Sequence, residues 1–482
     1  MAIVIVGLGP GDPALLTRQA WDVLSLAGEI YLRTGRHPVV SGLPSGAAIH
    51  SFDQLYEEAD SFERVYQTIV DKVLELSRRP SGVVYGVPGH PLVGEATVTA
   101  LLDRAKLGGV TVRLVAGLSF IEPVLAALQV DGMTGLQVVD ALEVASRFHP
   151  PFDSDTPALL GQLYDRHLAS HVKLTLMNQY PDEHPVVLVH SAGTSAEVVE
   201  QVPLYAVDRS ELIDHLTALY VPPLPRTSGF VEFRETIAHL RGPNGCPWDR
   251  RQTHGSLREP LISETAEVMD ALDEDDTDAL CEELGDLLLL IVMHMQIATE
   301  EDEFSSADVI GGIDAKIRRR HPHVFGSTTV NGVEEVLSNW DAIKREEKGK
   351  TEPQSALDGV PVSLSALSQA SELVRRAAKQ GFQWPNETAA RAQVQEELSE
   401  LWAATTPSEL EAEFGDLLFA LVGLGRWLEL DPEIALRLAN RRFRMRFQSL
   451  EQRVRGQGRT LTSLRPDELL MLWRSSDTRV TG

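Results

Sequence analysis

The residues best able to do chemistry are acidic and lie in two similar stretches of the second half of the chain. One stretch reads ETAEVMDAL and then EELGDLLLLIVM, and the other reads EELSELWAA and then EAEFGDLLFALVG. A spacing of three residues places two carboxylates on one face of a helix, about one turn apart. Two such helices packed antiparallel would bring four carboxylates together. The matching acids are Glu264 and Glu397, Glu267 and Glu400, Glu283 and Glu413, and Asp286 and Asp416.

A single pair of glutamates on a helix is usually only a solvated face, so the pattern needs further support. Asp286 and Asp416 each lead directly into an apolar run, 287–293 and 417–424, where an unpaired carboxylate is costly. The whole pattern also recurs. Four carboxylates without cysteine or several histidines favour a hard cation, magnesium by default with manganese as a substitute. The sequence therefore predicts two metal sites.

Residues around each copy suggest what such a site would act on. The carboxylates would repel an anionic substrate unless a metal ion bridged them to phosphate oxygens. Basic residues after each copy are candidates to bind a phosphate chain, and a tryptophan beside a proline before each copy is a candidate to stack on a base, although ordinary packing explains the tryptophans as well. We predict phosphoryl chemistry, which needs mainly positioning and charge neutralisation. The candidates are Lys316, Arg319, Arg320, Arg442, Arg446, Trp248 and Trp384.

These motifs resemble a known family. The series NGCPWDRRQTHGSL, E-x-x-E, ELGD and RRHPHVF is similar to the MazG nucleotide pyrophosphohydrolases, and GFQWP, EELSE, EFGD and NRRFRMRF are similar to a second domain of that family. The resemblance covers 226–482. It implies an all-α, magnesium-dependent fold, usually dimeric, that cleaves NTPs and dNTPs between the α and β phosphates to monophosphate and pyrophosphate. Nucleotide-pool housecleaning is the implied role.

The two copies differ at two places in this pattern. Copy two has Glu396 before Glu397, where family members often carry a pair, whereas copy one has Ser263 before Glu264. Copy two also has the family's asparagine, Asn440, in the basic helix, where copy one has Asp314. We therefore expect copy two to be the better catalyst.

The N-terminal part of the chain has a different pattern of apolar residues. Short β-branched runs at 3–6, 83–85, 112–115 and 186–189 alternate with amphipathic helices, which predicts an α/β domain. Its first segment, IVIVGLGPGDPALLT, reads as a strand, a glycine-proline turn and a helix start, with Asp12 as the cap and Pro13 at the first position. Glycines there would let a ligand approach the backbone. A tight turn without a ligand is the alternative.

The string GLGPGDPALLT resembles the tetrapyrrole methylases, which use S-adenosylmethionine, and YGVPGHPLVGEATV and AGLSFIEPVLAAL look like later cofactor loops of that family. Many methylases have G-D-P where this chain has Gly89-His90-Pro91, so methyl transfer itself stays open. The whole layout resembles the bacterial YabN-type proteins. The implied cofactor-binding residues are Gly7, Gly9, Pro10, Gly11, Asp12, Pro13, Gly89 and His90.

The change from strand-like to helical sequence patterns sets the boundaries of the predicted domains. The proline-rich stretch VPPLPRTSG, 221–229, reads as a linker, and helical patterns dominate after it. We predict a methylase-like α/β domain at 1–225 and two all-α MazG domains at 226–350 and 351–482. Because a helical domain with an apolar face normally needs a partner, we expect either a homodimer or pairing of the two MazG domains within one chain.

Composition limits the partners. The 482 residues include 44 basic and 70 acidic side chains, a formal net charge of −26, which argues against stable binding to nucleic acid or anionic membranes. No apolar run is long enough to span a membrane, and the N-terminus reads as a strand and not as a signal peptide. Two cysteines fit a reduced compartment. We expect a cytoplasmic protein whose partners are nucleoside triphosphates.

Two other functions compete with this interpretation. In the first, the chain is a regulatory protein in which the MazG domains are relics and the N-terminal domain senses a metabolite. In the second, it is principally an S-adenosylmethionine-dependent methyltransferase. Binding without turnover would favour the sensor, and methyl transfer to a porphyrin-like acceptor would favour the methyltransferase.

Overall fold

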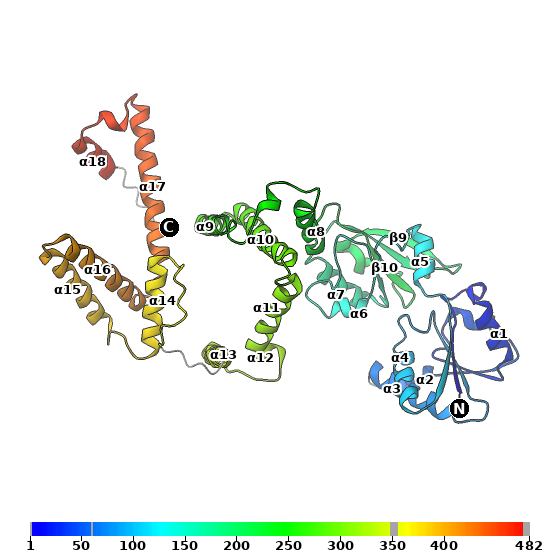
Figure 1. Ribbon diagram of the computed structural model, residues 1–482. Helices are drawn as coiled ribbons and strands as arrows, with labels where there is room; N and C mark the ends of the chain where they lie inside the picture. Colours follow the sequence, from blue (N-terminus) through cyan, green and yellow to red (C-terminus); the bar gives the residue numbers. More distant parts are fainter. Residues whose placement is uncertain (1, 59–60, 348–354, 476–482) are drawn as a thin grey trace. The chain divides into compact units, whose positions relative to one another are not determined.

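A computed structural model describes residues 2–58, 61–347 and 355–475. The chain divides into two compact units, Met1–Gln252 and Thr253–Gly482. The first unit holds all the strands that the structure describes, and the second is helical (Figure 1). The predicted boundary between residues 350 and 351 lies outside the described residues.

The first sheet of the α/β unit is parallel throughout, in the order β3-β2-β4-β1-β5. Alternate residues of β1 face opposite sides: Ile3 and Ile5 pack with α3 and α4, while Val6 packs with α1. Burial on both faces explains why the inner strands β1 and β4 read as continuous apolar runs. The elements are β1 Ala2–Gly7, η1 Pro13–Leu15, α1 Arg18–Leu26, β2 Glu29–Leu32, η2 Pro38–Gly42, β3 Ala48–Ser51, α2 Asp53–Glu58, α3 Phe62–Leu76, β4 Val83–Val87, α4 Ala96–Leu107 and β5 Thr111–Val115.

The second sheet of this unit is mixed, in the order β6-β7-β10-β8-β9, with only β6 and β7 parallel. One face packs on α6 and α7 and the other on α5. The elements are α5 Ile121–Leu128, β6 Gln137–Asp140, α6 Ala141–Ala145, β7 Ala158–Gly161, α7 Arg166–Leu176, β8 Pro185–His190, β9 Val198–Pro203, η3 Leu204–Arg209, β10 Thr217–Val221, α8 Phe230–Arg241 and η4 Asp249–Arg251.

The stretch expected to be a linker is fixed to the second sheet's domain. Asp155 accepts hydrogen bonds from the backbone N–H groups of Ser228, at 2.9 Å, and Gly229, at 2.8 Å. Leu224 N–H also donates to Ser154 O. Proline and glycine here shape a packed surface segment, and the first unit continues beyond it through α8 to Gln252.

The helical unit contains two antiparallel hairpins, α9 with α10 and α15 with α16 (Figure 1). Asp276 caps α10 by accepting from the N–H groups of Asp278 and Ala279, and Thr406 caps α16 by accepting from that of Glu409, so a side chain marks the start of each second helix. The elements are α9 Arg258–Glu274, α10 Thr277–Glu300, α11 Ser306–Arg320, α12 Pro322–Phe325, α13 Val333–Glu347, α14 Ala366–Lys379, α15 Glu387–Ala403, α16 Pro407–Trp427, α17 Pro432–Gly456, η5 Leu461–Ser463 and α18 Pro466–Ser475.

Membrane-crossing helices need a long apolar stretch, and none of the helices within residues 2–58, 61–347 and 355–475 has one.

Candidate functional site

The first hairpin brings its predicted carboxylates together. Glu264 and Glu267 lie on α9 and Glu283 on α10, and ligand oxygens of these three residues all lie within 4.8 Å of one another. Asp286, one turn further along α10, is close enough for its charge to raise the pKa values of Glu264 and Glu283. The antiparallel packing of two helices, each with acids three residues apart, creates this cluster.

The carboxylates of the first cluster repel one another. Partial desolvation raises the pKa of Glu264, and the negative charges of Glu267 and Asp286 raise it further. The same two causes raise the pKa of Glu283. A cation would relieve this repulsion, because it favours the charged form of every neighbouring carboxylate.

The second hairpin repeats the arrangement with a different closest trio. Ligand oxygens of Glu397 on α15 and of Glu413 and Asp416 on α16 lie within 4.8 Å of one another. Partial desolvation raises the pKa of Glu400, with further contributions from Glu413 and Glu397. Gln393 donates a hydrogen bond of 2.7 Å to Glu397, one turn away on α15. Six of the eight predicted acids therefore lie in the two ligand groups, and Asp286 and Glu400 are near enough to interact electrostatically with their members.

Both clusters fit a hard divalent cation. Their donor atoms are all carboxylate oxygens, and the side chains are half-buried or exposed, so water and a phosphate chain can reach them. Magnesium commonly takes one or two carboxylates together with water and substrate phosphates. The repulsion between the carboxylates of each cluster also favours a bound cation such as magnesium, because a cation offsets the negative charges.

Two predicted phosphate-binding arginines have a protein partner. Arg319 and Arg320, at the end of α11, both donate hydrogen bonds to Glu347 at the end of α13, with Arg319 Nε 2.8 Å from Oε1 and Arg320 Nε 3.0 Å from Oε2. These bonds lower the pKa of Glu347 to about 2. Lys316, on the same helix, is half-buried. A phosphate chain would have to compete with Glu347 for these arginines.

The basic residues of the second copy lie on α17. Arg446 donates a hydrogen bond of 2.6 Å to Trp473 O and lies over the Trp473 ring. Asn440 and Arg442 are exposed on the same helix. Further toward its N-terminus, Arg437 forms ion pairs with Asp270 and Asp273 of α9, at 2.7 and 3.1 Å. α17 thus contacts the helix that carries Glu264 and Glu267.

The two tryptophans are accessible but belong to different units. Trp384 precedes α15 and is 42% exposed, with its indole nitrogen 3.9 Å from a Cβ built at Gly423 on α16. It therefore sits against the hairpin that carries the second cluster. Trp248 is 67% exposed and lies in the first unit, just before η4.

The glycine-rich loops of the α/β unit meet each other. Gly9 and Gly89 exchange backbone hydrogen bonds of 3.2 and 2.9 Å. A Cβ at Gly7 would lie 2.5 Å from Gly117 N and 2.7 Å from Gly89 O, so the contact of these three loops requires glycine at position 7. Asp12 caps the short η1 turn through Ala14 N–H, with Pro13 as the first residue of that turn. Gly11 is buried, and His90 Nδ1 accepts from Leu92 N–H.

A pocket of about 670 Å³ opens beside these loops within the α/β unit. Of the predicted cofactor residues, Pro10 and Gly89 line it. Its other walls come from both sheets and include Arg33 and Glu95, which form an ion pair of 2.5 Å. Burial raises the pKa of Glu95, and the Arg33 guanidinium opposes that effect. The volume suits a small organic ligand.

Comparison with known proteins matches both halves of this architecture. The model of the tetrapyrrole (corrin/porphyrin) methylases covers residues 2–208, and that of the MazG nucleotide pyrophosphohydrolase domain covers residues 252–325. The uncharacterized protein YabN of Bacillus subtilis (strain 168) is 42% identical over 488 residues, 98% of each chain. The chain belongs to the YabN family. The predicted resemblances and fold class are confirmed.

Other similarities cover one half of this YabN-family chain. The nucleoside triphosphate pyrophosphohydrolase/pyrophosphatase MazG of Thermotoga maritima is 42% identical over 247 residues, 51% of this chain and 95% of its own. The crystal structure of uroporphyrin-III-C-methyltransferase from Thermus thermophilus is 20% identical, with a TM-score of 0.36, over 46% of this chain and 91% of its own.

Sequence reasoning missed the polar wall of the pocket. Arg33 follows β2 and lies outside the glycine motifs, whereas Glu95 precedes α4 within YGVPGHPLVGEATV but was not among the predicted cofactor-binding residues. A signal was present, since both follow buried strands of a parallel sheet, where ligand sites form at the carboxyl ends. The pairing of the two strands was needed to bring Arg33 and Glu95 together.

Proposed function

We propose that this YabN-family protein hydrolyses nucleoside triphosphates and their deoxy forms to the monophosphate and pyrophosphate, with magnesium as cofactor. The observation that carries the proposal is the carboxylate cluster on α9 and α10, inside the MazG-matched residues 252–325, and its repetition on α15 and α16. Nucleotide-pool housecleaning is the role that this activity would serve.

In this proposal, the carboxylates bind the metal ion and the arginines bind the phosphate chain. Glu264, Glu267, Glu283 and Asp286 would hold the ion in copy one, and Glu397, Glu400, Glu413 and Asp416 in copy two. Magnesium held there would supply neutralisation of the phosphate charge and an activated water nucleophile. Arginines on α11 and α17 would neutralise and orient the phosphate chain, and Trp384 would stack on the base.

The decisive experiment is product analysis with magnesium. Pyrophosphate and monophosphate in equal amounts are the expected products, and release of inorganic phosphate without pyrophosphate would disprove the proposal. The double variant Glu397→Gln/Glu400→Gln should lose most of the turnover if copy two is the better catalyst, and Glu264→Gln/Glu267→Gln should lose less. Glu411→Gln on α16 and Glu259→Gln on α9 are matched controls that remove an exposed carboxylate of the same hairpins.

A second candidate function concerns the pocket of the α/β unit. We propose that it binds S-adenosylmethionine, because the glycine loops and the volume of about 670 Å³ leave room for a ligand of that size. Calorimetry with S-adenosylmethionine tests this, and a bulky substitution, Gly89→Val, should abolish binding. Binding without methyl transfer would support a sensor role for the unit.

Pairing of the helical domains completes the proposal. Leu284, Leu288 and Ile291 on α10 are 49%, 40% and 41% exposed, and Leu418, Phe419 and Leu421 on α16 are similarly exposed. Such apolar surface normally faces another helix. Light scattering coupled to chromatography would distinguish a chain dimer from pairing within one chain.

A further inference from the structure

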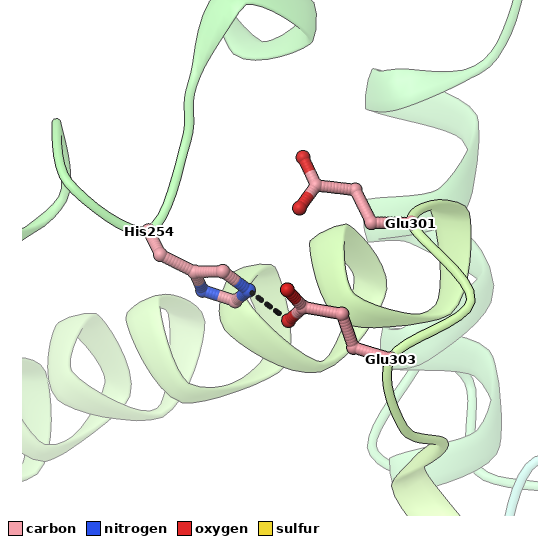
Figure 2. A group of neighbouring side chains, drawn as sticks. All are labelled: His254, Glu301 and Glu303. Carbon is pink, nitrogen blue, oxygen red and sulfur yellow. Dashed lines mark ion pairs between the residues drawn. The ribbon is translucent and has the colours of Figure 1, made fainter.

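His254, Glu301 and Glu303 form a ligand cluster of a different kind in the first MazG copy (Figure 2). Their ligand atoms all lie within 4.8 Å of one another. His254 lies just before α9, and the two glutamates follow α10 directly. Because α9 and α10 are antiparallel, the cluster closes the open end of the hairpin, opposite the turn that joins the two helices.

The backbone fixes both glutamates. Asp302 between them has a φ of 56°, and Glu303 N–H donates a hydrogen bond of 2.9 Å to Ala298 O. This pattern is the left-handed turn that commonly ends a helix. It satisfies the last carbonyls of α10 and directs Glu301 and Glu303 toward the side on which His254 lies (Figure 2).

A second histidine orients the ring of His254. His254 Nδ1 lies 2.6 Å from His294 Nδ1, with the two ring planes 3° apart, so one nitrogen donates a hydrogen bond to the other. The Nε2 atom of His254 therefore points at the carboxylates. A metal-binding histidine almost always has its other nitrogen held in this way.

The surroundings of Nε2 fit a cation better than a hydrogen bond. The atom is shielded from solvent and has no well-aligned hydrogen-bond partner among the described residues, although Glu303 Oε2 lies 3.3 Å away. Neighbouring ligands with bonds of about 2.1 Å to one metal ion lie about 3.0–3.4 Å apart. The contact distance matches two ligands of a shared ion.

We propose that His254, Glu301 and Glu303 bind a divalent transition-metal ion of the zinc class, which clips the start of α9 to the end of α10. The imidazole favours such an ion over magnesium, and three protein ligands leave a position for water. By holding the open end of the hairpin, the ion would position the helices that carry Glu264, Glu267 and Glu283.

The second hairpin provides an internal comparison. Glu429 there has a φ of 55°, and Leu430 N–H donates a 2.9 Å hydrogen bond to Gly425 O, so the same turn ends α16. Matching the two turns places Leu428 opposite Glu301 and Leu430 opposite Glu303, and neither leucine has a ligand atom in its side chain. The clip therefore belongs to copy one alone, and one ion per chain is expected.

The test uses the full-length chain, stripped of metal with a chelator and held in millimolar magnesium so that the carboxylate clusters are occupied. Zinc is then added, and bound zinc is measured by equilibrium dialysis and elemental analysis. Wild type should retain one zinc ion per chain. His254→Gln and Glu303→Gln should weaken that binding by about tenfold or more, which is at least the effect of losing a group that only supports a ligand.

Two further measurements keep the outcome unambiguous. Glu259→Gln removes an exposed carboxylate of α9 and should bind zinc as wild type does. Circular dichroism checks that each variant is folded, and Glu303 is half exposed, so its substitution should leave the fold intact. Equal zinc binding by wild type and His254→Gln, or no zinc binding by wild type in magnesium, would overturn the proposal.

Discussion

Arg33 Nη1 lies 2.5 Å from Glu95 Oε1, and the Glu95 side chain is only 2% exposed. A buried pair of this kind is strongly destabilising to break, because the remaining charge loses its partner. Glu95→Gln should therefore lower the free energy of unfolding of the α/β unit by about 3–5 kcal/mol. Chemical unfolding followed by circular dichroism measures the change.

The double variant Arg33→Met/Glu95→Gln is the matched control for that prediction. It removes both charges, so it should recover much of the stability that the single variant loses. A double variant as unstable as Glu95→Gln alone would mean that the pair contributes through packing and not through charge.

Magnesium and acid should both stabilise the helical unit, because each reduces the repulsion between the clustered carboxylates. The pKa values of Glu264, Glu283 and Glu400 are raised in the folded protein, so the folded state takes up protons more readily than the unfolded state. Without metal, the unit should become more stable as pH falls from neutral through the raised pKa values toward 4.5. Magnesium at neutral pH should raise the midpoint of thermal unfolding.

Glu264→Gln/Glu283→Gln removes two of the four charges in copy one. Calorimetric scans of this variant should have a smaller magnesium-induced shift and a flatter dependence on pH than wild type. If both responses are unchanged, repulsion in the first cluster does not limit stability.

Glu347 accepts hydrogen bonds from Arg319 and Arg320, the two arginines of α11 that are predicted to bind phosphate. If Arg319 and Arg320 bind the substrate, Glu347→Gln should lower KM by freeing them, while Glu334→Gln on the same helix should leave KM unchanged. A KM that rises in Glu347→Gln would instead mean that Glu347 holds the arginines in their working position. Steady-state kinetics with one nucleotide at fixed magnesium distinguishes these results.

Glu347 should also affect how the stability of the protein depends on pH in the acid range. The pKa of Glu347 is about 2, below its ordinary value of 4.5, so its contribution to stability is present above pH 4.5 and is lost as pH falls toward 2. Glu347→Gln should lack this part of the acid sensitivity, which a series of unfolding curves between these pH values would detect.

His37 should make the α/β unit sensitive to mild acid. Burial, and then the nearby charge of His215, lower the pKa of His37 to about 4, whereas the ordinary value is 6.5. The unfolded chain therefore binds a proton that the folded chain does not, and stability should fall by up to about 3 kcal/mol as pH drops from 6.5 to 4. In His37→Gln this dependence should be flatter, and an unchanged pH profile would contradict the assignment.

The sequence predicted those parts of the molecule that depend on local periodicity. The apolar runs at 3–6, 83–85, 112–115 and 186–189 lie in β1, β4, β5 and β8, and in β1, β4 and β8 the runs are apolar because most of their residues are buried. The acids on α9 and α10 converge because their spacing puts each pair on one helix face. Duplication made this pattern visible without coordinates.

What the sequence did not predict depends on contacts between distant residues. Arg33 and Glu95 are 62 positions apart and meet only because β2 and β4 are neighbours. His254 and Glu303 meet because α10, with 24 residues, is longer than the antiparallel α9, with 17, and so reaches the segment before α9 that carries His254; no motif records this. Glu347 was not foreseen as the partner of Arg319 and Arg320, because the turn between α11 and α13 decides which residues they face.

The turn at Asp302 and its counterpart at Glu429 give the two hairpins the same backbone conformation at the end of the second helix. Since the same backbone bonds end α10 and α16, side chains could be transplanted from one hairpin to the other without redesigning the chain path. Leu428→Glu and Leu430→Glu together would install the two carboxylates of the first hairpin's ligand set at the end of α16. Duplicated domains of this kind can therefore acquire or discard a binding function through a few substitutions at one helix end, while the architecture stays constant.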